Sequence, residues 1–344
     1  MSTSTEPTTP DLADALAAAD ALAASGRSLE ALDLLQAAGA GSGDEAVEIR
    51  LAELRYAAFA DLPRTGFDRW PVDAPGVDRS GPPVVLEIPA AELTADVARR
   101  SIQSRGSLLV RGLFREHTAR FVDAVEATFA SRSAVAADPS RASSWWRNLP
   151  LSGPEAKSLG RYWVNGSGGM LACDSPRTLD MLFETYTSLG LRDVVAEYLG
   201  ERPVLSANKC TLRRVPLDSN TDWHQDGAFL GSGIRALNIW IALTDCGVDS
   251  PGMDLVPRRF DAVVETGTGG AIFDWAVGPD TVTAVAPDAP PVRPEFKAGD
   301  ALLFDDLYLH RTAVDPSMVR PRYAIESWFF APTDYPEGQV PLVW

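Results

Sequence analysis

The sequence predicts a mainly β protein with flanking helices, in which a double-sheet jelly roll follows a small N-terminal helical unit. Six or more short apolar segments alternate with turns rich in Gly, Pro and Asp in the second half of the chain, as is typical of jelly rolls. Amphipathic helical segments precede them. The 344 residues are 45% hydrophobic, which is enough to build one large core and a smaller unit beside it.

The N-terminal part has the periodicity of three short helices with glycines at their ends. They are expected at residues 11–25, 28–38 and 44–60. This pattern resembles one and a half tetratricopeptide-type repeats, although solenoids normally need at least three repeats. We therefore expect residues 1–62 to pack on the main domain as a helical cap. A module that docks a protein partner is the alternative. Residues 63–83 form a predicted linker, and residues 84–344 the main domain.

Within the main domain, helical and extended patterns alternate before strands take over. Helices are expected at residues 90–104, 116–130 and 176–199. Strands are expected at residues 84–88, 106–114, 204–215, 234–246, 253–256 and 323–331, with two more before residue 299. The strand at 204–215 carries polar alternates, namely Asn208, Thr211 and Arg213.

Composition excludes several classes of function. The formal net charge of −16 argues against nucleic acid and anionic membrane surfaces as partners, because both require a basic surface. The three cysteines are widely spaced and form no C-x-x-C pair, so neither a zinc site nor a disulfide framework is indicated. No secretory signal and no apolar run of about 20 residues is present. The sequence therefore predicts a cytoplasmic protein.

A candidate metal site begins at Asp222-Trp223-His224-Gln225-Asp226-Gly227. In an extended strand, residues i and i+2 point to the same face, so His224 and Asp226 can converge. Two histidines and one carboxylate form the facial triad of non-haem Fe(II) oxygenases. The chain holds only three histidines, and His310, 84 positions after Asp226, ends an apolar run. The alternative is that both histidines are hydrogen-bonded core residues, but their order and the arginine that follows favour a metal site.

Two further stretches are candidates for a pocket near this site. Asn238 and Trp240 share one face of the apolar strand 234–246, which suggests that this face lines a site. The irregular stretch 140–172 contains Trp145, Trp146, Tyr162 and Trp163 between glycines. These aromatic residues either form a pocket wall or lid, or they fill a hydrophobic seam.

In sequence order, these motifs resemble the phytanoyl-CoA dioxygenase-like enzymes, a family of Fe(II)/2-oxoglutarate-dependent oxygenases. The motifs are Trp223-His224-Gln225-Asp226-Gly227, Ala236 to Leu243, Ser250-Pro251-Gly252-Met253, Gly299-Asp300 and His310-Arg311-Thr312. The resemblance covers about residues 108–331. It implies a double-stranded β-helix of cupin-like type.

The resemblance also implies a role for individual residues. His224, Asp226 and His310 would bind iron, and 2-oxoglutarate and O₂ would occupy the remaining positions. Arg322, with the hydroxyl of Thr312, would bind the distal carboxylate of 2-oxoglutarate, and Asn238 would contact the co-substrate. Arg320 is the alternative anchor, but Pro321 marks a strand start that leaves Arg320 in the turn.

The expected activity is hydroxylation of an unactivated C–H bond in a medium-sized, partly apolar small molecule. Secondary metabolism is a setting by analogy alone. Desaturation, cyclisation and epimerisation remain alternatives on the same scaffold. A catalytically silent binding or adaptor protein is the alternative from another class. The N-terminal helices would serve either a protein partner or packing within the chain.

Overall fold

The computed structural model describes residues 11–65, 70–219 and 221–344. Residues 1–10 of the predicted helical unit and residues 66–69 of the predicted linker lie outside these ranges. The helices are α1 (Leu12–Ala24), α2 (Ser28–Gly39), α3 (Glu45–Ala57), α4 (Ala95–Arg105), α5 (Thr118–Ala137), α6 (Gly153–Ser158), α7 (Arg161–Gly166), α8 (Pro176–Ser188), α9 (Leu191–Leu199), α10 (Gly227–Leu230) and α11 (Pro279–Val285). The strands are β1 (Leu86–Pro89), β2 (Ser107–Arg111), β3 (Gly169–Leu171), β4 (Val204–Val215), β5 (Ala236–Ala242), β6 (Gly252–Leu255), β7 (Ala301–Phe304), β8 (His310–Ala313), β9 (Arg322–Phe330) and β10 (Pro341–Val343).

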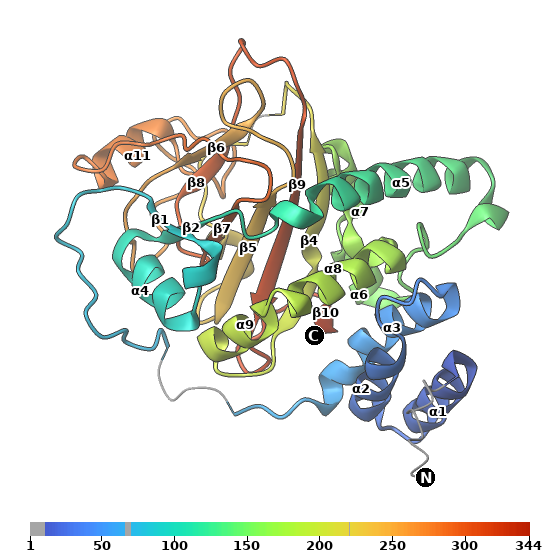
Figure 1. The fold of residues 1–344 in the computed structure, drawn as a ribbon. Helices are drawn as coiled ribbons and strands as arrows, with labels where there is room; N and C mark the ends of the chain where they lie inside the picture. The colour runs from blue at the N-terminus through green and yellow to red at the C-terminus, as the bar shows by residue number, and fades with distance from the viewer. Residues whose placement is uncertain (1–10, 66–69, 220) are drawn as a thin grey trace, which may run out of the picture.

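Eight strands form a major sheet in the order β1-β2-β7-β5-β9-β4-β10, with β3 paired to β4. β1 and β2 are parallel, and the other pairs are antiparallel. Helices α4, α5, α8 and α9 lie on one side of this sheet (Figure 1). On β5, Leu237, Ile239 and Ile241 point into the core that these helices share with the sheet. Both faces of β5 are therefore buried, one against the helices and the other against the rest of the protein.

The other face of the major sheet packs on a second, smaller sheet made of β6 and β8. Isolated bridges extend this minor sheet: His224 pairs with His310 beyond one edge, and Leu255 pairs with Val292 beyond the other. Trp240 and Phe304 fill the space between the two sheets. Two facing sheets with helices on the outer side of one confirm the predicted fold class.

Helices α1–α3 pack on one another, and α3 lies against the C-terminal strand β10 (Figure 1). Arg55 of α3 is buried and donates a hydrogen bond to the carbonyl of Val343 at 2.8 Å. Glu48, also buried, pairs with Arg177 of α8 at 3.0 Å. These contacts favour the prediction that the N-terminal helices form a cap packed on the main domain over the alternative of a free docking module. The division of the chain at residues 62 and 83 stays a prediction. Among the described residues, no helix has the length and apolar content needed to cross a bilayer.

Two element predictions are wrong. The expected single helix 176–199 is broken into α8 and α9 at Gly190, whose φ of 71° interrupts the helical backbone. The two strands expected before residue 299 are absent from the described residues. Helix α11 and the single bridges of Val292 and Phe296 stand there, because a proline-initiated helical turn replaces the extended pattern.

Candidate metal centre and pocket

The structure brings His224, Asp226 and His310 together. Ligand atoms of the three side chains all lie within 4.8 Å of one another. The two histidines are cross-strand partners: the amide of His224 donates to the carbonyl of His310 at 2.9 Å, and the amide of His310 donates back at 3.0 Å. The i, i+2 spacing predicted that His224 and Asp226 lie on one extended strand. The structure differs, because Asp226 no longer has an extended backbone. Its backbone is already helical (φ −62°, ψ −26°), and it occupies the position just before α10 without a side-chain capping hydrogen bond.

Backbone carbonyls fix the orientation of both imidazoles. Nδ1 of His224 lies 2.9 Å from the carbonyl oxygen of Asp222, and Nδ1 of His310 lies 2.9 Å from that of Tyr308. A carbonyl oxygen can only accept, so each Nδ1 carries a proton, and Nε2 is the nitrogen left to bind a metal. Burial lowers the pKa of His310 to about 3, which keeps this ring neutral. Two imidazoles and a carboxylate are the donor set of a facial triad.

Gln225, between two of these residues, anchors the long loop that follows β6. Its fully buried amide donates to the carbonyls of Leu307 (2.6 Å) and Ala262 (3.2 Å), and its oxygen accepts from the amide of Val264 (2.7 Å). No motif in the sequence indicates this role for Gln225.

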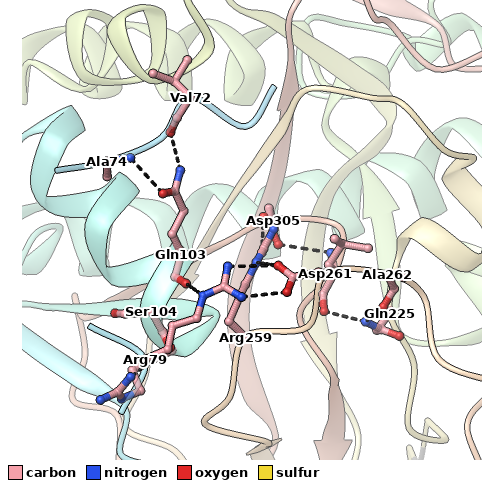
Figure 2. A network of polar contacts seen from close by, with 12 residues as sticks. Val72, Ala74, Arg79, Gln103, Ser104, Gln225, Arg259, Asp261, Ala262 and Asp305 are labelled. Atoms are coloured by element: carbon pink, nitrogen blue, oxygen red, sulfur yellow. Dashed lines mark hydrogen bonds and ion pairs between the residues drawn. The ribbon is translucent and has the colours of Figure 1, made fainter. Parts of the chain in front are cut away.

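Residues from the predicted linker hold the same loop from the far side (Figure 2). Arg79 pairs with Asp261 at 2.7 Å and donates to the carbonyl of Gln103 at 2.9 Å. Beside the Arg79–Asp261 pair, Arg259 forms an ion pair with Asp305 (Figure 2). The amide of Gln103 in turn bonds the backbone of Val72 and Ala74. The segment 72–79 is therefore tied to the main body rather than lying free of it.

A pocket of about 480 Å³ opens above the triad, between the two sheets. All six predicted site residues line it. Its other polar lining residues are Lys209, Thr211, Arg213, Thr221 and Glu326. Its apolar lining residues are Trp163, Phe229, Trp240, Met253, Trp275 and Phe304. Of the aromatic residues in stretch 140–172, Trp163 thus forms pocket wall, whereas Trp146 is buried away from the pocket.

Arg322 is the buried cation of this pocket. Its side chain is 2% exposed, and burial lowers its pKa to about 10. Nη1 donates to the carbonyls of Gly252 (2.6 Å) and Pro251 (3.3 Å). Within the described ranges, no residue accepts a hydrogen bond from its Nε. Arg320, the alternative anchor, is exposed and pairs with Asp249 at 2.7 Å.

Other buried polar atoms of the pocket also lack a partner. Nε of Arg213 and Oδ1 of Asn238 make no hydrogen bond to any described residue. Thr312 lies beside Thr221, whose hydroxyl accepts from the Thr312 amide at 2.8 Å. Buried polar groups in native proteins are nearly always paired. The Nε atoms of Arg213 and Arg322 therefore call for an acceptor and Oδ1 of Asn238 for a donor, so this wall is built to meet a polar ligand.

Comparison with known families identifies one match. Residues 215–315 match the model of the phytanoyl-CoA dioxygenase family, described as Phytanoyl-CoA dioxygenase (PhyH). The matched segment is less than a third of the chain. It contains the three clustered residues, Asn238 and Thr312, but ends before Arg322. Over this segment the resemblance predicted from the sequence motifs is confirmed. No curated protein matches the chain.

Three solved structures are loosely similar. EctD from S. alaskensis, solved with 2-oxoglutarate and 5-hydroxyectoine, is 16% identical with a TM-score of 0.48, covering 80% of this chain and 89% of its own. The non-heme α-ketoglutarate-dependent carbocyclase SnoK from nogalamycin biosynthesis is 17% identical with a TM-score of 0.44, covering 73% and 87%. The epimerase SnoN, in complex with Fe³⁺, α-ketoglutarate and nogalamycin RO, is 19% identical with a TM-score of 0.41, covering 69% and 83%. At these TM-scores the likeness carries no argument about the activity of this chain.

Proposed function

We propose that this chain, whose residues 215–315 are those of a phytanoyl-CoA dioxygenase-like protein, is an Fe(II)/2-oxoglutarate-dependent oxygenase. Its expected reaction is hydroxylation of an unactivated C–H bond in a medium-sized, partly apolar small molecule. One C–H group, one 2-oxoglutarate and one O₂ become one C–OH group, one succinate and one CO₂. One observation carries the proposal: a His-Asp-His cluster faces the same pocket as a buried arginine whose Nε has no partner among the described residues.

The residues present fit the two absent groups. His224, Asp226 and His310 would hold the iron, which suits two imidazoles and a carboxylate and leaves positions open for other ligands. With 2-oxoglutarate and O₂, the bound iron supplies the oxidising power needed to attack an unactivated C–H bond. Arg322 would bind the distal carboxylate of 2-oxoglutarate through its unpaired Nε and fork geometry. Thr312 and Asn238 would add a hydroxyl and an amide to the same wall.

The remaining work of the chain is to orient these groups and to exclude water. The carbonyls of Asp222 and Tyr308 engage Nδ1 of both imidazole rings and leave Nε2 of each as the nitrogen available to a metal. Nε2 of His310 lies 3.7 Å from Oδ2 of Asp226. Trp240 and Phe304, between the sheets, keep the region beside Arg322 dry. In a water-poor pocket, the pairing of a guanidinium with a carboxylate is stronger than at the surface.

The test is an anaerobic titration of the protein with Fe(II) and 2-oxoglutarate, followed in visible light. We expect the weak absorption band of the iron–2-oxoglutarate chelate in the native chain and its loss in His310→Ala. On admission of O₂, succinate release should follow, increased by compounds that fit the pocket. Iron binding without the band would instead support a silent binding protein. Mass analysis of the product then separates hydroxylation (+16 Da) from desaturation, cyclisation and epimerisation.

A further inference from the structure

Among the described residues, Lys209 is the one lysine that lines the pocket, and the proposed reaction assigns it no role. It projects from β4 on the same face as Thr211 and Arg213, two and four positions along the strand. Its side chain is 13% exposed, and its Nζ lies 3.8 Å from Oδ1 of Asp226. The ammonium also lies 4.0 Å from the centre of the Phe229 ring and 5.7 Å from that of Trp163.

The other charges of the pocket compensate one another once iron and co-substrate are in place. Arg213 has Glu326 within 4.0 Å. Arg322 would be paired by one carboxylate of 2-oxoglutarate. Asp226, the present ion-pair partner of Lys209, would bind iron. The iron charge would be balanced by Asp226 and the second carboxylate of 2-oxoglutarate, which leaves the Lys209 ammonium uncompensated.

A cation with so little exposure favours an anion beside it, because a charge largely withdrawn from water is stabilised by pairing or by other strong polar contacts. The two rings beside it contribute some cation–π stabilisation, but they also displace water from the ammonium. No other charged side chain lines the pocket among the described residues beyond those accounted for above. The missing anion must therefore arrive with the substrate.

The mouth of the pocket indicates the rest of the substrate. Trp163, Phe229 and Trp275 line the pocket and are 50%, 41% and 37% exposed. Phe273, itself half exposed, stacks on Trp275 with an interplanar angle of 4° at 5.0 Å. Exposed aromatic residues gathered at one opening mark a binding surface, and flat rings favour a flat or extended apolar partner.

We propose that Lys209 is a substrate-binding residue that selects an amphipathic acid. In this proposal its ammonium pairs with a single carboxylate of the substrate, and the apolar body of the substrate lies against Trp163, Phe229 and Trp275. The proposal rests on the proposed function, since iron and 2-oxoglutarate must take up the charges of Asp226 and Arg322. A purely structural alternative is that Lys209 serves only to neutralise Asp226.

The test compares acids with their uncharged amides of the same shape. The probes are 3-phenylpropionate, indole-3-acetate and octanoate, each with its amide. They are titrated calorimetrically without O₂ into protein saturated with Fe(II) and 2-oxoglutarate. For at least one pair, the acid should bind about 10- to 100-fold more tightly than the amide, which is the range expected of a charge-assisted hydrogen bond.

Variants assign the preference to Lys209. Lys209→Met keeps the length of the side chain and should reduce the preference to less than about threefold, whereas Lys209→Arg should restore it. Lys297→Met, an exposed lysine paired with Asp245, is the matched control and should leave the preference intact. Because every titration is made at saturating iron and 2-oxoglutarate, a weaker metal site in Lys209→Met does not imitate the result.

Two outcomes overturn the proposal while leaving the proposed function standing. In the first, the chelate band forms but no acid binds better than its amide. In the second, Lys209→Met keeps the acid preference and loses only iron affinity, which is the result of the structural alternative. Failure of the native chain to form the band refutes the proposed function itself, and this inference with it.

Discussion

Replacement of Arg322 by alanine is the most informative single perturbation of the co-substrate wall. The guanidinium is held by the carbonyls of Pro251 and Gly252, and it lies over the ring of Trp240 at 5.2 Å. Its Nε is left for a ligand. Arg322→Ala therefore removes the proposed partner of the 2-oxoglutarate carboxylate without touching any of the three clustered metal-binding candidates.

The structure sets the size of the effect. Burial lowers the pKa of Arg322 to about 10. At about 1.4 kcal/mol per pKa unit, keeping this cation charged in the pocket costs on the order of 3 kcal/mol. A carboxylate that pairs with the guanidinium recovers that free energy. Leaving one member of a buried pair alone typically costs about 3–5 kcal/mol. The affinity for 2-oxoglutarate should therefore fall between about 150-fold and several thousand-fold.

The assay is the anaerobic titration of iron-loaded protein with 2-oxoglutarate. Arg320→Ala is the matched control, because Arg320 is exposed and holds only a surface pair with Asp249. We expect its affinity to stay within about fivefold of the native value. A larger loss in Arg320→Ala than in Arg322→Ala would reverse the assignment. Losses below about tenfold in both would show that the carboxylate binds elsewhere.

Three further predictions concern the metal site, the loop and the N-terminal helices. Divalent iron should raise the melting temperature of the native chain by several degrees, since a ligand at 100 times its Kd adds about 2.7 kcal/mol; His310→Ala should abolish this rise, and a rise that persists would exclude His310 as a ligand. Gln225→Ala leaves three backbone groups without their partner and should lower the free energy of unfolding by about 3 kcal/mol, measured by urea denaturation. A change below about 1 kcal/mol would mean that the other contacts of the loop are enough to keep it in place. Removal of residues 1–62 should lower the melting temperature, because Val204 and Val343 lose apolar contacts, yet leave 2-oxoglutarate affinity within a few-fold; a folded chain that no longer binds 2-oxoglutarate would show that these helices complete the site.

The three residues of the candidate metal centre could be predicted from the sequence because histidine is rare in this chain. With only three histidines, one in H-x-D and one after an apolar run, few pairings were open. Pro321 separated Arg322 from Arg320 in the same way, by fixing where a strand begins. The predicted backbone conformation at Asp226 was nevertheless wrong. The chain leaves extended geometry after His224 and turns into α10, a change that no period-2 pattern indicates.

Lys209 was not predicted as a pocket residue, because the polar residues of β4 were all assigned to one face of the strand. Asn208, Thr211 and Arg213 stand out as polar residues on that strand, but Asn208 is out of phase with the other two. Its amide instead bonds the backbone of Ser158 and Val340, outside the pocket. The pairing of β4 with β9 shifts register between Leu205 and Cys210, but Lys209 keeps the phase of Thr211 and Arg213, since all three line the pocket. Counting back by twos from Arg213 would have found Lys209.

The pairing of His224 with His310 also bears on how the chain folds. The two residues stand 86 positions apart, and their ring centres are 4.4 Å apart only because two strand ends join there. Closing so long a loop costs entropy before any contact repays it, and such long-range pairings form slowly. A partly collapsed chain with local helices and hairpins would have one imidazole and one carboxylate, but no triad. In refolding, the onset of metal binding should therefore lag behind the recovery of secondary structure and mark the moment at which the His224 segment joins the minor sheet.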